Sequence, residues 1–192
     1  MTSSLFRRFL AFAALLTAFS CAQAQNPRVE FKTTMGNFTL ELYPEKAPKT
    51  VDNFLQYANS GFYKGTVFHR VIDGFMIQGG GLDANLQKKP TRAPIQNEAD
   101  NGLKNEPYTI AMARTSDPNS ATSQFFINVA DNKSLNHRAK TATDWGYTVF
   151  GSVVQGKDVV DKIKAVSTGT QGMYENVPQT PVVITQATIV SQ

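Results

Sequence analysis

The residue with the clearest chemical potential is Arg70, a cation inside an otherwise apolar segment. Alternation along a strand predicts that Phe68, Arg70 and Ile72 share one face, while His69 and Val71 lie on the other. An arginine is always charged and carries several planar donors, so one held among apolar side chains can act on a bound polar group. Because arginine is mostly exposed, the residue type alone favours a surface cation whose alkyl stem covers apolar neighbours. The segment by itself leaves both interpretations open.

Other residue types that commonly carry catalysis are scarce. His69 and His137 are the only histidines, and a lone histidine beside a core strand is more often a hydrogen-bonded structural residue than a catalyst. The run Gly79-Gly80-Gly81 lacks the spacing and the following helix of a phosphate loop, and instead predicts a close passage or turn of the backbone. One cysteine excludes a disulfide framework and makes a Cys/His zinc site unexpected. No nucleophile elbow and no Ser-His-Asp or Cys-His set is found.

Two further segments place polar and apolar side chains on one face. Residues 75–78 direct Met76 and Gln78 to the same side of a strand. Residues 123–129 alternate between a core set, Phe125, Ile127 and Val129, and an opposite set, Gln124, Phe126 and Asn128. An aromatic residue among polar neighbours, as Phe126 is, accords with ordinary packing as well as with a binding surface.

The apolar periodicity predicts a mainly β chain. Eight segments show strand patterns: 28–32, 37–42, 67–72, 75–78, 108–113, 123–129, 149–154 and 182–190. Two segments repeat apolar residues at helical spacing, one from Pro48 to Gly61 and one over 158–166. Residues 82–106 have little periodicity, which indicates a functional or disordered loop. Since strands and helices do not alternate, the pattern favours an antiparallel barrel or sandwich with helices packed on it.

One compact domain is expected, because the chain has 192 residues and shows no repeat or linker. Its 41% hydrophobic and 18% charged residues argue against a disordered, highly charged chain. The formal net charge is +4, and it falls to +2, from 17 basic and 15 acidic residues, when residues 1–24 are left out. So small and dispersed a charge argues against nucleic acid as a partner.

Residues 1–24 have the order of a secretory signal peptide. A polar start ends in the basic pair Arg7-Arg8, eleven mostly apolar residues follow, and Ala22-Gln23-Ala24 forms a small-x-small site. Eleven residues are too few to span a bilayer. Cleavage after Ala24 would leave a cysteine-free domain, residues 25–192, which suits an oxidising compartment and predicts the periplasm. The alternative is lipidation of Cys21, although the three residues before it make a poor lipidation site.

Three motifs, in the same order, resemble the cyclophilin family of peptidyl-prolyl cis-trans isomerases. They are Phe68-His69-Arg70-Val71-Ile72 with Gly74-Phe75-Met76-Ile77-Gln78-Gly79-Gly80, then Ile110-Ala111-Met112-Ala113, then Ser123-Gln124-Phe125-Phe126-Ile127. The resemblance spans residues 29–190, and residues 96–103 and 128–132 are similar to the exported bacterial branch, the periplasmic isomerase A group. It implies an eight-stranded antiparallel β-barrel closed by two α-helices, with a groove on its outside as the active site. It also implies no cofactor, no metal, and proline-containing unfolded or partly folded polypeptides as partners of a monomer.

The resemblance also assigns site residues by position. The expected catalytic set is Arg70, Phe75, Gln78 and Phe126. The expected substrate-binding set is Met76, Ala113, Arg114, Gln124, Leu135 and Tyr147. The apolar side chains at positions 75, 76, 126 and 135 match the wall that receives the proline ring, and positions 78, 113 and 124 match groups that hold the peptide backbone. Tyr147 stands where many members have a His, and Arg114 where many have an Asn that contacts the peptide through its main chain.

Two departures from the family pattern bear on ligand preference. Ser134 stands where many members have a tryptophan, and residues 136–145 make a longer loop than in compact members. In the family this tryptophan packs on the immunosuppressant cyclosporin, so weak cyclosporin binding is expected. Trp145, the only tryptophan, would either pack on the barrel or fold over the groove and replace the missing ring.

The activity that the resemblance implies is acceleration of rotation about Xaa-Pro bonds, which would assist the folding of exported proteins. A non-catalytic, proline-directed binding module on the same fold is the main alternative, because a fold does not decide function. A pure binder needs the apolar pocket but not the arginine, so Arg70 favours the enzyme. A hydrolase is not expected, since no nucleophile–base pair is found.

Overall fold

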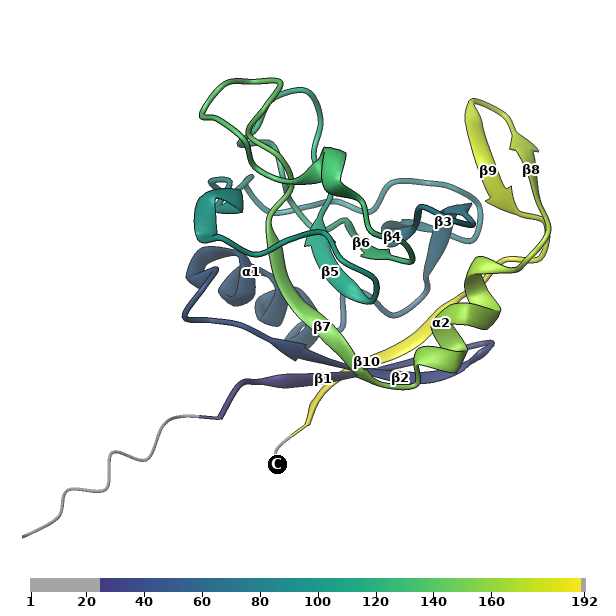
Figure 1. Cartoon of the computed structure of the whole chain (residues 1–192). Coiled ribbons are helices and arrows are strands. Elements are labelled where there is room, and N and C mark those ends of the chain that lie inside the picture. Colours follow the sequence, from purple (N-terminus) through teal and green to yellow (C-terminus); the bar gives the residue numbers. More distant parts are fainter. Residues whose placement is uncertain (1–24, 191–192) are drawn as a thin grey trace, which may run out of the picture.

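An eight-stranded antiparallel sheet forms most of the computed structural model, which describes residues 25–190 (Figure 1). Its strands are β1 (Arg28–Thr33), β2 (Gly36–Leu42), β3 (Thr66–Ile72), β4 (Met76–Asp83), β5 (Thr109–Met112), β6 (Phe125–Asn128), β7 (Val149–Gln155) and β10 (Ile184–Val190). They lie in the order β10-β1-β2-β7-β5-β6-β4-β3. Each strand overlaps one of the eight segments predicted from the sequence.

The sheet curls until its two edge strands approach each other. The backbone N–H of Gly65 donates to the carbonyl of Ile184 at 2.8 Å, and that of Phe68 donates to the carbonyl of Val182 at 3.0 Å. The two edge strands are joined by these few bonds and not by a continuous hydrogen-bond ladder, so the sheet is an open half-barrel. The prediction of a mainly β fold with eight antiparallel strands and two helices is confirmed.

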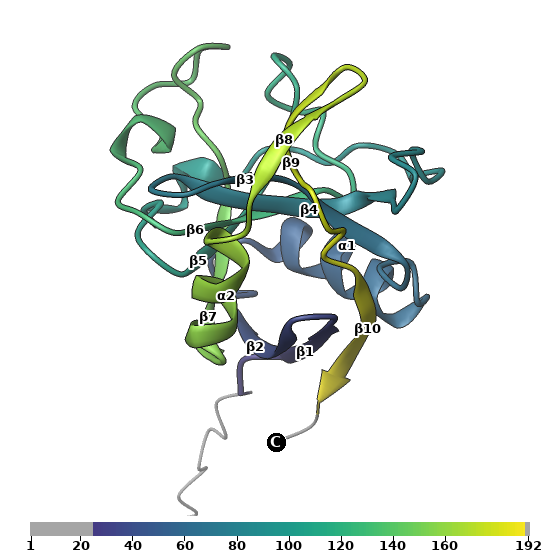
Figure 2. The ribbon, with the colours of Figure 1, turned by 90° about the vertical axis from the view of Figure 1, so that its right-hand side faces the viewer.

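The two helices lie on opposite sides of the curled sheet (Figures 1 and 2). Helix α1 (Pro48–Asn59) has its proline in the first turn, where a missing N–H costs little, and buries Val51 and Phe54. Helix α2 (Lys157–Lys164) buries Val160 and Ile163. Their apolar faces complete one core that is rich in stacked and edge-on rings: Phe31, Phe38, Phe54, Tyr63, Phe68, Phe125 and Phe150.

Residues 82–106, in which the sequence shows little periodicity, are anchored by hydrogen bonds between Glu98 and the N-terminus of α1. Glu98 accepts hydrogen bonds from the backbone N–H groups of Lys49 and Thr50, at 3.1 and 2.9 Å, and from the Thr50 hydroxyl at 2.7 Å. A carboxylate at a helix N-terminus satisfies free donors and interacts favourably with the dipole. The loop is therefore tied to the first turn of α1.

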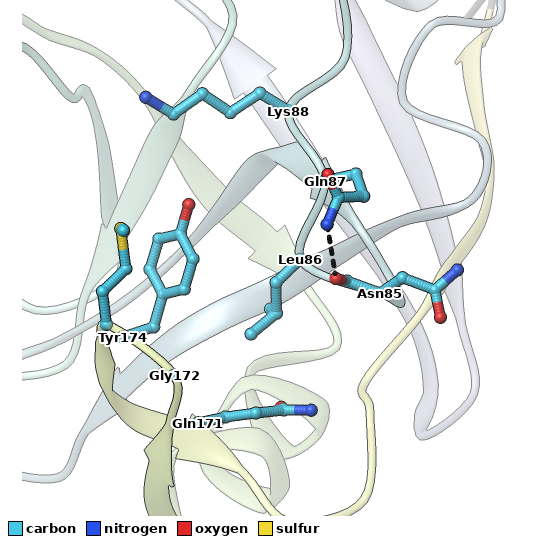
Figure 3. Close-up of a pocket in the computed structure, with 8 residues that line it drawn as sticks. Asn85, Leu86, Gln87, Lys88, Gln171, Gly172 and Tyr174 are labelled. Carbon is cyan, nitrogen blue, oxygen red and sulfur yellow. Dashed lines mark hydrogen bonds between the residues drawn. The ribbon is translucent and has the colours of Figure 1, made fainter.

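A second, two-stranded sheet projects from the body of the molecule, and the sequence did not predict it (Figure 2). It consists of β8 (Thr168–Gln171) and β9 (Tyr174–Pro178), and β9 packs against β3. Most of β8 is exposed, so it lacks the alternation of apolar residues that marks a half-buried strand. A hollow of about 620 Å³ lies between its tip and the loop at Leu86 and Lys88 (Figure 3).

A β-bulge in β3 corrects the prediction that Phe68 and Arg70 share a face. Phe68 is paired with Gly79 and Arg70 with Gln78, so His69 is an extra residue in the strand. Phe68 consequently enters the core, while Arg70 lies outside it and stays partly exposed. Strict alternation failed because it assumes a regular ladder.

The glycine run in β4 allows the close backbone passage that the sequence predicted. A Cβ on Gly79 would lie 2.9 Å from the Val67 carbonyl oxygen, and one on Gly80 would lie 2.7 Å from the Phe125 ring. Gly80 also has a φ of +81°, a backbone conformation that residues other than glycine rarely adopt. The run therefore brings β3 and β6 tightly against β4 without forming a phosphate loop.

His69 is buried beneath the β8–β9 hairpin. Its ring lies edge-on to Tyr174, with the centroids 6.4 Å apart, and only 6% of the residue is exposed. Within residues 25–190 its Nδ1 has no hydrogen-bond partner, so the expected hydrogen-bonded structural role is only partly met. Burial lowers the pKa of His69 from 6.5 to about 4.

This histidine should make the fold sensitive to mild acid. Because the unfolded chain binds the proton more readily, stability contributed by neutral His69 is complete above pH 6.5 and is lost as the pH falls toward 4. We expect the free energy of unfolding to fall by about 2 kcal/mol between pH 7 and pH 5. Denaturant unfolding at both pH values should show a smaller difference for His69→Gln than for the wild type. An equal loss in His69→Gln and the wild type would contradict the assignment.

Candidate active site

Strand register places Arg70 at one end of a row of side chains that crosses the sheet. Arg70 is paired with Gln78, Gln78 with Phe126, Phe126 with Ala111, and Ala111 with Val149. Directly paired residues on one face lie about 5 Å apart. Since the alternate residues of β4 and β6, Ile77 and Ile127, belong to the core, this row lies on the outer face of the half-barrel.

An apolar cluster occupies this outer face and is separate from the core. Its buried members are Met76, Ala111, Phe126 and Val149. Half-buried side chains surround them: Ile72, Phe75, Leu103, Ala113, Leu135 and Tyr147. The four residues predicted to receive a proline ring are therefore together, with an apolar surface that is partly open to solvent.

Arg70 lies beside this cluster with its donors free. Its Cζ is 6.0 Å from the centroid of the Phe75 ring. Across residues 25–190, no carboxylate lies within ion-pair distance of Arg70, and its guanidinium makes no hydrogen bond. A half-buried arginine without an internal partner is available to a bound molecule, which favours the placed cation over the surface alternative.

The two glutamines predicted to hold a peptide backbone are bonded to each other. The Nε2 of Gln78 donates to the Oε1 of Gln124 at 3.0 Å. This bond orients both amides next to Phe126 and leaves the Nε2 donors of Gln124 and the Oε1 acceptor of Gln78 for a ligand. A small hollow of about 140 Å³ begins here, and Ala113, Arg114 and Ser120 are among the residues that line it.

Tyr147 and Arg114 extend the apolar cluster on its other side. The Tyr147 ring meets Phe126 edge-on, with 5.6 Å between centroids, and the Arg114 guanidinium lies 4.6 Å from the centroid of the Tyr147 ring. Arg114 also donates from Nε to the Gly146 carbonyl at 3.0 Å and from Nη1 to the Thr115 carbonyl at 2.8 Å. The sequence predicted only a main-chain role for Arg114, whereas its side chain forms part of the site wall.

A network of asparagines positions the apolar cluster, and the sequence analysis missed it. Asn132 donates to the Phe75 carbonyl and to Asn128 Oδ1, both at 2.7 Å, and Asn128 donates to Asn105 Oδ1 at 3.2 Å. Asn105 in turn donates to the Leu135 carbonyl at 3.1 Å. The alternation of 123–129 could have pointed to Asn128, because a polar residue beside a core strand must find partners when it is buried.

The two departures from the family pattern lie next to the site. Ser134 is exposed in a short 3₁₀ helix, Lys133–Leu135, that supplies Leu135 to the apolar cluster. The ring of Trp145 contacts His137, with 6.1 Å between centroids, and Lys140. Both contacts lie within its own loop, and among the described residues the buried Trp145 Nε1 has no hydrogen-bond partner. Trp145 is not a member of the apolar cluster.

The other features of the described chain do not compete with this site. None of the predicted site residues lines the larger hollow beside the β8–β9 hairpin (Figure 3). Between residues 25 and 190, we find no grouping of three or more His, Cys, Asp or Glu side chains suited to a metal ion. In that same range, every helix is too short or too polar to cross a membrane.

Comparisons with known proteins match this chain over nearly all of the described residues. A family profile described as "Cyclophilin type peptidyl-prolyl cis-trans isomerase/CLD" matches residues 28–189. Peptidyl-prolyl cis-trans isomerase cyp18 of Streptomyces antibioticus is 61% identical over 84% of this chain and 97% of its own length. Isomerase B of Escherichia coli K12 is 54% identical over 84% and 98%, and isomerase A of Dickeya dadantii is 54% identical over 92% and 93%.

Solved structures agree with these relatives. A cyclophilin type isomerase of Cryptosporidium parvum superposes with a TM-score of 0.69 at 26% identity, covering 87% of this chain and 99% of that one. A second structure of that protein, obtained in the presence of the dipeptide ala-pro, gives a TM-score of 0.68 at 27% identity, covering 86% and 99%. The outer-face cluster, the free arginine and these matches lead to one conclusion: the chain belongs to the cyclophilin-type peptidyl-prolyl cis-trans isomerases.

Proposed function

We propose that this isomerase catalyses rotation about Xaa-Pro bonds at the outer-face site, with Arg70 as its catalytic residue. The observation that carries the proposal is the guanidinium of Arg70, which has no partner within residues 25–190 and borders the apolar cluster. The proline ring would lie on Phe126 and Met76, and the peptide backbone would bond to Gln78 and Gln124.

The chemistry needs only a donor aimed at the rotating bond. Rotation about a peptide C–N bond costs about 18–20 kcal/mol, because twisting removes its partial double-bond character. In the twisted state the prolyl nitrogen regains a lone pair, which accepts a hydrogen bond that the planar amide cannot. A donor from Arg70 to this nitrogen therefore stabilises the twisted state more than either planar one, which is the condition for catalysis.

The surroundings of Arg70 strengthen this interaction. The apolar side chains of Phe75, Met76 and Phe126 exclude water around the proline ring, and hydrogen bonds are stronger where water is excluded. The Gln78–Gln124 pair would hold the peptide on one side of the bond while the other side turns. These steps require no nucleophile and no proton transfer.

A non-catalytic binding module remains the alternative for the same surface, and one measurement separates the two. Exchange between the cis and trans forms of a short Xaa-Pro peptide should be followed by NMR without a coupled protease. We expect catalytic amounts of the protein to accelerate exchange. A binder would shift the peptide resonances without changing the exchange rate.

We further propose that the enzyme is exported and assists protein folding in the periplasm. The signal-like residues 1–24 lie outside the described residues, so support comes from the sequence and its relatives. The match to isomerase A of Dickeya dadantii covers 92% of this chain, which is more than residues 25–192 alone account for. Residues 25–192 contain no cysteine, which suits an oxidising compartment.

The exported protein should begin at Gln25. Intact-mass measurement of protein recovered from the periplasm should give the mass of residues 25–192, because the small-x-small site ends at Ala24. The variant Cys21→Ser should give the same product. A product that retains Cys21 with a diacylglyceryl group, and that Cys21→Ser abolishes, would contradict cleavage after Ala24.

A further inference from the structure

Arg114 is held rigidly at the junction of the apolar cluster and the small hollow beside Gln124. Its guanidinium lies over the Tyr147 ring at 4.6 Å and donates to the carbonyls of Gly146 and Thr115. Three independent contacts fix the plane and the direction of the guanidinium. An arginine restrained in this way loses little side-chain entropy when it binds a ligand.

The positive charge of Arg114 is not neutralised by the protein. Over residues 25–190, no Asp or Glu oxygen lies within 4.0 Å of the Arg114 guanidinium nitrogens, and the two groups that accept hydrogen bonds from this guanidinium are neutral carbonyls. The carboxylate nearest in the chain, that of Asp117, accepts a hydrogen bond from the Asn119 backbone N–H and forms no ion pair with Arg114. Nη2 donates no hydrogen bond in the described chain, which leaves a charged donor at the edge of the site.

The hollow next to Arg114 has room for one short polar side chain. Its volume of about 140 Å³ exceeds the space that a single water molecule needs several times over. Its lining combines Arg114 with residues that carry polar side chains: Gln78, Thr115, Ser120, Thr122 and Gln124. Such a lining suits a hydrogen-bond acceptor, and a charged acceptor more than a neutral one.

The hollow lies within one or two residues of a bound proline. Ala113 both borders the apolar cluster and lines the hollow, and Gln78, the cross-strand neighbour of Phe126, lines it as well. An extended peptide advances about 3.3 Å per residue, so a peptide with its proline on Phe126 passes the hollow almost at once.

We propose that Arg114 is a specificity-determining residue that selects proline-containing segments with an aspartate or glutamate within two residues of the proline. This inference rests on the proposed function of the outer-face site. The carboxylate would enter the hollow and accept a charge-assisted hydrogen bond from Nη2. The free guanidinium of Arg70 adds a second positive charge to the same face, so the field there favours anionic peptides.

The test compares matched peptides that differ in one charge. Each peptide carries glutamate or glutamine at one of the two positions before or the two positions after a single proline, and kcat/KM is measured by protease-free NMR exchange. For the wild type we expect kcat/KM to be roughly three- to tenfold higher for the glutamate peptide at one of these positions. A factor of this size lies between the effect of an exposed ion pair and that of a charge-assisted hydrogen bond. Each result is the ratio of the two peptides, so a general loss of activity cancels.

The variants assign this preference to the side chain. Arg114→Gln should bring the glutamate-to-glutamine ratio close to one, while Arg114→Lys should keep part of it. Lys32→Gln removes the same charge from an exposed position on β1 and should keep the wild-type ratio. In the wild type the ratio should also shrink in about 1 M salt, where the Debye length is about 3 Å.

The outcomes separate this inference from the proposed function. If the wild type isomerises both peptides of every pair equally, or if Arg114→Gln retains the preference, the role of Arg114 is wrong while the isomerase site stands. If the wild type accelerates exchange in none of the peptides, the proposed function fails first. If Arg114→Gln does not fold, a reduced ratio in Arg114→Lys beside the wild-type ratio in Lys32→Gln still assigns the preference to Arg114, and an unreduced ratio in Arg114→Lys overturns it.

Discussion

Replacing Arg70 by alanine is expected to slow isomerisation of a short Xaa-Pro peptide by about 10²–10³-fold, or roughly 2.7–4 kcal/mol of transition-state stabilisation. Arg70 is half-buried, and its guanidinium lies beside the Phe75 ring. None of its N–H donors bonds to another described residue, so they are available to the twisted peptide. Peptide affinity should fall less than the rate, because the apolar cluster around Phe126 and Met76 is untouched.

Two further variants make this expectation specific. Arg70→Lys should restore only part of the rate, since an ammonium lacks the planar set of donors. Arg92 provides a matched control, because its Cζ also lies 6.0 Å from an aromatic centroid, that of Tyr57, but away from the outer-face site. Arg92→Ala should isomerise at the wild-type rate. An Arg70→Ala protein with unchanged circular dichroism and an unchanged rate would remove Arg70 from the mechanism.

Cyclosporin inhibition is the second large effect that we expect. The exposed Ser134 directly precedes Leu135 of the apolar cluster and offers little apolar area where many cyclophilins carry a tryptophan. Burying roughly 100–200 Å² of aromatic surface contributes about 2.5–5 kcal/mol at about 25 cal/mol per Å². Its absence should weaken cyclosporin binding by about two orders of magnitude or more. Isomerisation of short peptides should change less, because Arg70 and Phe126 do not depend on Ser134.

Titration of cyclosporin against three proteins tests this expectation. Ser134→Trp should bind the drug much more tightly than the wild type while its isomerisation rate changes little. Trp145→Phe should bind as weakly as the wild type, because the Trp145 ring contacts His137 and Lys140 in its own loop. Tight inhibition of the wild type that survives Trp145→Phe would show that the argument from Ser134 is wrong.

The sequence was sufficient to predict the strands whose apolar residues alternate regularly. In β6, period-two alternation correctly separated Phe125 and Ile127 in the core from Phe126 on the outer face. The same rule failed in β3, where the bulge at His69 shifts the register and turns Phe68 inward while Arg70 stays outside. A bulge depends on how two strands pair, and the alternation of residues within one strand gives no information about the strand that pairs with it.

The parts of the site that the sequence did not predict are formed by loops far apart in the chain. The Asn105–Asn128 bond and the contact of Arg114 with Tyr147 join residues that are separated by 23 and 33 positions. Polar side chains in such segments resemble ordinary loop residues until tertiary structure pairs them. The β8–β9 hairpin was missed for a related reason, because its exposed strand has no apolar face.

The most direct test of the central claim is an NMR titration of the isotope-labelled protein with an excess of an Xaa-Pro peptide, in which peptide exchange and protein amide shifts are recorded together. We predict that exchange becomes much faster than the uncatalysed process, which takes tens to hundreds of seconds. We also predict that the largest shifts fall on Arg70, Gln78, Ala113 and Phe126, the residues that meet on the outer face. Accelerated exchange with shifts confined to the hollow between Leu86 and Tyr174, or binding at the outer face without acceleration, would contradict the account.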